Sequence, residues 1–277
     1  MNNRQILRIL PAMPTSDGDG VKIRRVAAHG NMALLDPFLL VDEIAADDAA
    51  DYIGGFPPHP HRGFETITYM LEGQMRHTDH MGNEGLLKAG GVQWMTAGRG
   101  VIHAEMPEQN EGRLHGFQIW INLPARDKMQ PARYQEFDPQ QIPGISLPGG
   151  GQARVITGSL QGTSGPVSGI ATQPLYFDIR LPAGSQLDVP VPQGHTVLLY
   201  CYDGDISIAG KPLQQGQLAQ LGDGDSVAIS ATSDARLLLL AGQPLNEPIA
   251  NYGPFVMNTR EEIEQAIADY RNGTLTN

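Results

Sequence analysis

Residues 54–73 read GGFPPHPHRGFETITYMLEG, a stretch that combines a β-strand pattern with two closely spaced histidines. In its second half Thr66 and Thr68 alternate with apolar residues, which is the two-residue period of a half-buried strand. The same alternation returns in HGFQIWINLP at residues 115–124. The chain's 33 glycines and 21 prolines supply turns between such runs. The pattern predicts an all-β protein built from many short strands.

The strand pattern stops at residues 136–152, where three prolines and four glycines in EFDPQQIPGISLPGGGQ leave no periodicity. We expect a linker or crossing segment there. It would separate a strand-rich region at residues 1–135 from a second one at residues 153–250, and a tail at residues 251–277 would follow. Two strand-rich regions of similar size indicate a duplicated β-barrel.

The tail contains the one helix that the sequence predicts with clear boundaries, NTREEIEQAIADYRNG at residues 258–273. Thr259 and Glu262 have the spacing of a capping box, and Gly273 is a suitable stop. Four side chains would share one apolar face that packs against a barrel: Ile263, Ala266, Ile267 and Tyr270. We expect this helix to have no chemistry of its own.

Composition and charge exclude several classes of protein. The formal net charge of −11 repels phosphate backbones, so we expect no direct contact with nucleic acid. No apolar run approaches the roughly 20 residues that a membrane-spanning helix needs, and the N-terminal apolar run is too short for a signal peptide. The single cysteine, Cys201, cannot form an internal disulfide. Together these features predict a cytoplasmic protein with no membrane partner.

Two pairs of metal-ligand residues have matching spacing. His59 and His61 are separated by one residue, as are His103 and Glu105 in TAGRGVIHAEMPE. Residues i and i+2 of a strand point to the same face, so each pair would aim at one point. Imidazole nitrogens and carboxylate oxygens suit a divalent first-row metal. Glu65 has the same parity as His59 and His61, so it could be a ligand instead of Glu105, or a partner that orients an imidazole.

Two long motifs resemble the pirin family of the cupin superfamily: HPHRGFETITYMLEG, from residue 59, and QWMTAGRGVIHAEMP, from residue 93. DPFLLVDE at residues 36–43 and GPFVMNT at residues 253–259 extend the likeness toward both ends. The resemblance implies a bicupin, in which two antiparallel jelly-roll β-barrels lie face to face and a C-terminal α-helix follows. It implies a metal-binding barrel at residues 1–135 and a barrel without metal at residues 153–250.

The resemblance also implies the ligands of a single metal ion, usually iron: His59, His61, His103 and Glu105. Glu65 stands at the glutamate of the general cupin motif HxHx3E, and in pirins the HxE pair supplies the carboxylate. Glu65 would then lie behind the ligands. The ligand types would equally suit manganese, cobalt, nickel, copper or zinc.

The activity that the resemblance implies is that of a quercetin 2,3-dioxygenase. The substrates would be a flavonol and O2, carbon monoxide would be released, and the catalytic residue Glu105 would accept or steer the proton of the flavonol hydroxyl. The alternative is a non-enzymatic, metal-binding regulator that acts through a protein partner. A cupin enzyme acting on a sugar phosphate or an amino acid is a third reading, and the motif segments offer it no basic substrate clamp.

The remaining histidines carry less weight. His77 and His80 lead into a polar turn, so we interpret them as exposed loop residues whose loss would leave metal binding near normal. His115 opens a strand near Trp120, where both packing and a place on a cavity wall remain open. Two more histidines lie in turn contexts with no partner nearby in the sequence: His29 and His195.

Three further features have no predicted role in the chemistry. Cys201 lies in the apolar run TVLLYCYDG and is interpreted as a buried packing residue. Arg62 has the opposite strand parity to His61, so it would point away and pair with an acidic residue. The triple glycine at residues 149–151 lacks the Lys-Ser/Thr and helix of a phosphate loop, so no nucleotide cofactor is expected.

Overall fold

The computed structural model describes residues 2–27 and 32–277, and His29 lies outside the described residues. The chain divides into two compact units. We call one the histidine unit; it comprises Met13–Leu34, Phe38–Pro139 and Leu245–Asn277. We call the other the apolar unit; it comprises Met1–Ala12, Leu35–Pro37 and Gln140–Pro244.

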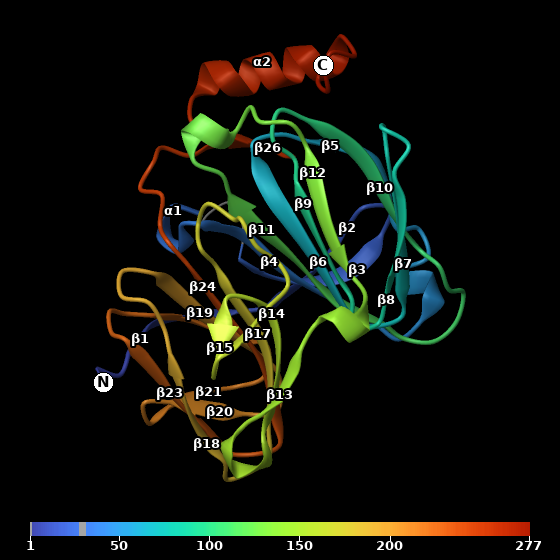
Figure 1. Ribbon diagram of the computed structural model, residues 1–277. Helices are drawn as coiled ribbons and strands as arrows, with labels where there is room; N and C mark the ends of the chain where they lie inside the picture. The colour runs from blue at the N-terminus through green and yellow to red at the C-terminus, as the bar shows by residue number, and fades with distance from the viewer. Residues whose placement is uncertain (1, 28–31) are drawn as a thin grey trace. The chain divides into compact units, whose positions relative to one another are not determined.

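The histidine unit contains a seven-stranded and a four-stranded antiparallel sheet, whose strands are labelled in Figure 1. The larger sheet has the order β12-β9-β6-β11-β4-β3-β2, and the smaller one has the order β5-β10-β7-β8. The strands of the larger sheet are β2 (Met13–Asp17), β3 (Val21–Ala27), β4 (Phe38–Ala46), β6 (Phe64–Glu72), β9 (Val92–Thr96), β11 (Leu114–Asn122) and β12 (Arg133–Phe137). Those of the smaller sheet are β5 (Phe56–His61), β7 (Gln74–Asp79), β8 (Glu84–Lys88) and β10 (Val101–Pro107).

A break separates β5 from β6 at Arg62 and Gly63. Gly63 has a φ of +90°, and a Cβ there would lie 2.0 Å from the carbonyl oxygen of Val256, so only glycine fits. The Arg62 guanidinium points away from His61 and pairs with Asp269 at 2.7 Å, which confirms the prediction from parity. Because the strand is interrupted, the alternation that begins at the histidines does not continue into β6.

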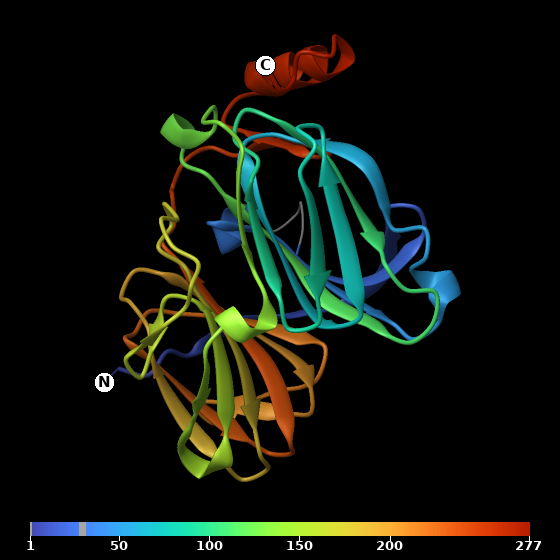
Figure 2. The same ribbon diagram turned by 45° about the vertical axis from the view of Figure 1, so that its right-hand side comes forward.

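The apolar unit repeats the plan of a seven-stranded and a four-stranded sheet, in the orders β1-β22-β19-β24-β17-β14-β13 and β18-β23-β20-β21. Figure 2 draws most of its strands in yellow-green to orange. The larger sheet contains β1 (Ile6–Pro11), β13 (Gly144–Ser146), β14 (Gln152–Thr157), β17 (Leu175–Leu181), β19 (Thr196–Asp203), β22 (Gln217–Leu221) and β24 (Ala235–Gly242). The smaller contains β18 (Gln186–Pro190), β20 (Ile206–Ile208), β21 (Lys211–Leu213) and β23 (Ser226–Ala231), and β15 (Ser159–Leu160) pairs separately with β16 (Thr163–Ser164).

The units differ from the expected boundaries at both ends of the chain. β1 lies within residues 1–135 but pairs with β22, so it completes a sheet of the apolar unit. The expected linker at residues 136–152 contributes β13 to the same sheet. The tail at residues 251–277 belongs to the histidine unit. β1 and β22 are more than 200 residues apart in the chain, so their pairing leaves no local sequence pattern. The sequence therefore did not indicate that β1 belongs to the apolar unit.

The C-terminal helix α2 (Arg260–Arg271) begins as predicted. The Thr259 side chain accepts a hydrogen bond from the backbone of Glu262, and the Glu262 side chain accepts one from the backbone of Thr259. Ile263 and Ala266 are buried against Phe255 of the adjacent hairpin. None of the described helices is long and apolar enough to cross a membrane. The other short elements are α1 (Met32–Leu35), β25 (Ala250–Tyr252), β26 (Phe255–Met257), and the 3-10 turns η1 (Ala49–Asp51), η2 (Ala125–Asp127), η3 (Pro139–Gln141) and η4 (Pro148–Gly150).

Candidate metal centre

Three histidines from two neighbouring strands converge in the histidine unit. His103 on β10 lies directly opposite His59 on β5, and His61 follows two residues further along β5. One ligand atom from each of the three imidazoles lies within 4.8 Å of the others. The Nε2 atoms of His59 and His61 are 3.0 Å apart. The three histidines meet as predicted, whereas the fourth predicted donor, Glu105, is not part of this group among the described residues.

The state of these imidazoles fits a metal ion. The Nε2 atom of His103 is buried and has no hydrogen-bond partner among the described residues, so its lone pair is available to bind a metal ion. Burial, with a further contribution from neighbouring histidines, holds the pKa values of His61 and His103 well below the ordinary value. Both side chains are therefore neutral near pH 7, and the neutral imidazole is the form that binds metals.

Glu105 projects from the same strand as His103. The pairing of β10 with β5 shifts between these two residues, so that Glu105 faces Phe56. The Thr68 hydroxyl lies 2.8 Å from Oε1 of Glu105, and the Gln118 side-chain amide lies 3.3 Å from Oε2. Both partners belong to the larger sheet, so the carboxylate is held between the two sheets of the unit.

Glu65 occupies a different environment. It is buried on β6, and its Oε1 accepts a hydrogen bond from the Thr96 hydroxyl at 2.6 Å. Burial raises the pKa of Glu65 to about 7. Its side chain does not line the cavity that Glu105 shares with His59 and His61. The interruption at Gly63 explains the difference, because it ends the parity on which a role as ligand depended.

His77 corrects the sequence analysis. It is not an exposed loop residue but a buried side chain on β7, and its Nε2 lies 2.8 Å from Nδ1 of His103. The same histidine faces Glu105 across the β10–β7 pair. A ligand histidine usually makes such a second contact, which fixes its tautomer and ring orientation. His80 is exposed, as predicted.

The signal that could have identified His77 is its parity with Met75. Both side chains are buried, and they alternate with the more exposed Gln74 and Arg76 along β7. The polar character of RHTDHMGNEG hid this period, because the strand runs directly into its turn. Two residues of the larger sheet that contact Glu105 were not singled out either: Thr68 and Gln118.

A cavity of about 350 Å³ opens beside the cluster. His59, His61 and Glu105 lie on its wall, and exposed residues such as Asp17 and Pro57 lie at its mouth. Most of its remaining wall is apolar or backbone, with a polar group formed by Arg25 and Asp42. The apolar side chains on the wall are Ile23, Leu40, Ile44, Phe56, Trp120 and Pro254.

Comparison with known proteins assigns the family. A family model described as Pirin matches residues 20–121, and one described as Pirin C-terminal cupin domain matches residues 176–276. The chain belongs to the pirin family. The predicted bicupin class is thereby confirmed.

Relatives of this pirin cover nearly its whole length. A pirin-like protein of Caulobacter vibrioides is 49% identical over 98% of both chains. Pirin of Homo sapiens is 44% identical, over 93% of this chain and 89% of the human one. The crystal structure of a quercetin 2,3-dioxygenase from Acinetobacter baumannii aligns with a TM-score of 0.93 and 35% identity, over 99% of this chain and 98% of that chain.

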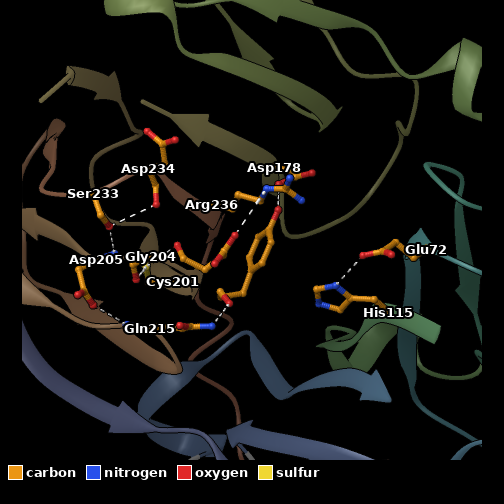
Figure 3. Close-up of polar contacts among 12 residues, drawn as sticks. Glu72, His115, Asp178, Cys201, Gly204, Asp205, Gln215, Ser233, Asp234 and Arg236 are labelled. Atoms are coloured by element: carbon orange, nitrogen blue, oxygen red, sulfur yellow. Dashed lines mark hydrogen bonds and ion pairs between the residues drawn. The ribbon is translucent and has the colours of Figure 1, made fainter. Parts of the chain in front are cut away.

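Two further candidate residues, His115 and Cys201, are buried. His115 is buried, with Nε2 at 2.9 Å from Glu43 and Nδ1 at 3.8 Å from Glu72, and Figure 3 shows the second contact. Cys201 is buried, and its Sγ lies 3.3 Å from the carbonyl oxygen of Gly204 (Figure 3). Burial raises the pKa of Cys201 to about 12, so the thiol stays protonated. The prediction that Cys201 is a packing residue is confirmed.

Proposed function

We propose that this pirin is a mononuclear metal-dependent dioxygenase that opens flavonols such as quercetin with O2. The observation that carries the proposal is the three-histidine cluster with Glu105 on the wall of a cavity of about 350 Å³. Pockets for small organic ligands typically span about 300–1,000 Å³ and are mostly apolar with a few placed polar groups. The name of the Acinetobacter baumannii structure supports the same activity.

The residues proposed as ligands are His59, His61, His103 and Glu105. Existing contacts leave the Nε2 atoms of His59 and His103 for the metal, because Nδ1 of His59 lies 2.8 Å from the Pro57 carbonyl and Nδ1 of His103 faces His77. We propose iron as the resident ion. A divalent transition metal held there would acidify a hydroxyl bound to it and would allow electron exchange with O2.

Glu105 is the proposed proton acceptor. Its Oε1 is close to the Thr68 hydroxyl, whereas Oε2 has, among the described residues, only the 3.3 Å contact with the Gln118 side-chain amide. Oε2 therefore keeps capacity to take the proton of the flavonol 3-hydroxyl. The apolar wall near Leu40 and Trp120 would hold the flat rings and exclude water from the reacting end.

The test is loss of flavonol absorbance together with release of stoichiometric carbon monoxide. Purified protein would be loaded in turn with iron, manganese, cobalt, nickel, copper or zinc and assayed with and without O2. A flavone without the 3-hydroxyl should not react, since it has no hydroxyl at that position that could lose a proton. Failure of every metal form to consume a flavonol with O2 would reject the proposal, and a regulator acting through a protein partner would then be the better reading.

A further inference from the structure

A charged group lies on the cavity wall at a distance from the histidines. Arg25 on β3 faces Asp42 on β4 in register. Its Nε lies 3.0 Å from Oδ1 of Asp42, and its Nη2 lies 2.6 Å from Oδ2. The same Nη2 lies 2.6 Å from Oδ2 of Asp17. All three residues line the cavity that His59 and His61 also line.

Strand register places this group at the far end of a polar row. Arg25 is opposite Asp42, Asp42 is opposite Gln118, and Gln118 is opposite Thr68. Neighbouring strands are about 4.8 Å apart, so Arg25 lies about 10 Å from Gln118 along the row. The Gln118 and Thr68 side chains contact Glu105. One ligand could therefore reach the histidine cluster with one end and Arg25 with the other.

The surface beside this row suits a flat ring system. Leu40, Asp42 and Ile44 alternate along β4, so all three face the cavity. Trp120 lies opposite Leu40 on the neighbouring strand. A partly buried charged pair is weak support for stability, because an apolar pair of similar volume is often as stable or more so. The charges of Arg25 and Asp42 therefore call for another role.

The balance of donors and acceptors indicates what the group binds. One guanidinium faces two carboxylates, so the group as a whole does not attract an anion. Within the described part of the chain, Nη1 of Arg25 has no hydrogen-bond acceptor, and the carboxylate oxygens of Asp42 keep unused acceptor sites. A donor beside acceptors matches two adjacent hydroxyl groups, each of which can both donate and accept. Carboxylates and phosphates offer no donor in return.

We propose that Arg25, Asp42 and Asp17 recognise vicinal hydroxyl groups on the ring of the substrate that lies remote from the histidines. This inference rests on the proposed function, since it names which flavonols the cavity prefers. It predicts that quercetin, with two adjacent hydroxyls on that ring, binds better than kaempferol with one. Galangin, which has none there, should bind weakest.

The first experiment measures kcat/KM of the metal-loaded protein for the three flavonols. Wild type should prefer quercetin over galangin by about 10–100-fold, as two ordinary hydrogen bonds would give. The double variant Arg25→Met/Asp42→Leu should lose this preference, so that its kcat/KM values for quercetin and galangin become equal. Arg24→Gln is the matched control, because Arg24 is next in sequence, does not line the cavity and should keep the full preference.

The second experiment separates this inference from the proposed function. Equilibrium dialysis of the metal-loaded protein in the absence of O2 measures the Kd of each flavonol without any turnover. The same order, quercetin before kaempferol before galangin, should appear in wild type and vanish in the double variant. Equal Kd and kcat/KM values for quercetin and galangin, or a preference that survives Arg25→Met/Asp42→Leu, would overturn the inference. Absence of turnover with a preserved binding order would instead reject only the proposed dioxygenase activity.

Discussion

The two units have the same sheet plan but fill it with different chemistry. In the described part of the apolar unit, one apolar cluster contains 25 buried side chains, from strands such as β19 and β24. In the described part of the histidine unit, some of the buried apolar side chains form smaller clusters, such as those that contain Met70 and Phe255. Buried ionisable side chains are numerous in the histidine unit and few in the described part of the apolar unit, where Arg4 is held by backbone carbonyls.

This difference shows how one architecture can serve as scaffold or as site. Burying an ionisable group costs free energy unless partners compensate for the lost water. The histidine unit bears that cost at His61, His103, Glu65 and Glu105, and groups of this kind gather at functional sites. The apolar unit places Val197, Leu199 and Cys201 in its cluster instead, and burial of these apolar side chains stabilises the fold.

The largest expected effect is loss of the metal ion when proposed ligands in the histidine unit are removed. Removal of a histidine from the apolar unit should not have this effect. The double variant His59→Ala/His103→Ala removes two proposed ligands, so its metal affinity should fall by more than the roughly 10–100-fold typical for loss of an outer partner. Elemental analysis of untagged protein gives the metal content per chain. His195→Ala in the apolar unit should keep wild-type content, and full retention of metal by the double variant would show that the ion lies elsewhere.

The next effect concerns chemistry rather than occupancy. Glu105→Gln keeps the shape and a weaker oxygen donor but cannot take a proton. We expect metal to be partly retained, while kcat for flavonol turnover falls by about 10²–10⁴, the usual contribution of a general acid or base. Metal content and kcat are measured on the same preparation. Wild-type kcat in this variant would mean that Glu105 is not the proton acceptor.

Sequence alone indicated the features that depend on neighbours along the chain. The i, i+2 spacing of His59 and His61 survives folding because both lie on one uninterrupted strand. The Thr259 cap of α2 is equally local, since its partner is only three residues away. Resemblance to pirins supplied the choice of Glu105 over Glu65, which parity alone had left open.

Features that depend on the register between paired strands were missed. The contact between His77 and His103 joins β7 to β10, and that between Arg25 and Asp42 joins β3 to β4. Register decides which side chains meet across such pairs, and a shift of one residue would turn each of them to the other face. At Gly63 the sequence instead indicated a feature that the structure lacks. The alternation that includes His61 was expected to continue to Glu65, and the backbone conformation of Gly63 interrupts it.

A smaller effect should appear in the dependence of stability on pH. Burial raises the pKa of Glu65 from the ordinary 4.5 to about 7. Between these values the unfolded chain releases the proton while the folded chain retains it, so stability falls as pH rises. The loss is complete above about pH 7 and amounts to about 3 kcal/mol. Denaturant unfolding of the metal-free protein from pH 4.5 to 8 measures it.

Glu65→Gln should remove this part of the pH dependence, because the amide does not titrate. Glu72→Gln is the matched control, since Glu72 lies on the same strand but is exposed. Identical pH profiles for wild type and Glu65→Gln would contradict a raised pKa at Glu65. The apolar unit offers no comparable buried carboxylate among its described residues, so the difference should belong to the histidine unit.

The smallest effect tests whether His77 orients His103. If Nε2 of His103 binds the metal as proposed, its Nδ1 carries the hydrogen and donates a hydrogen bond to Nε2 of His77. His77→Leu fills the buried site but removes the acceptor, so metal affinity should fall by about 10–100-fold. His77→Gln places an amide oxygen near the same point and should recover part of the loss. Competition with a chelator measures the metal affinity of both variants.

His80→Ala is the control, because His80 is exposed. Its metal affinity should match that of wild type. Equal affinities for His77→Leu and wild type would mean that the rigid strand β10 alone fixes the orientation of His103, and that this buried pair is packing rather than part of the centre.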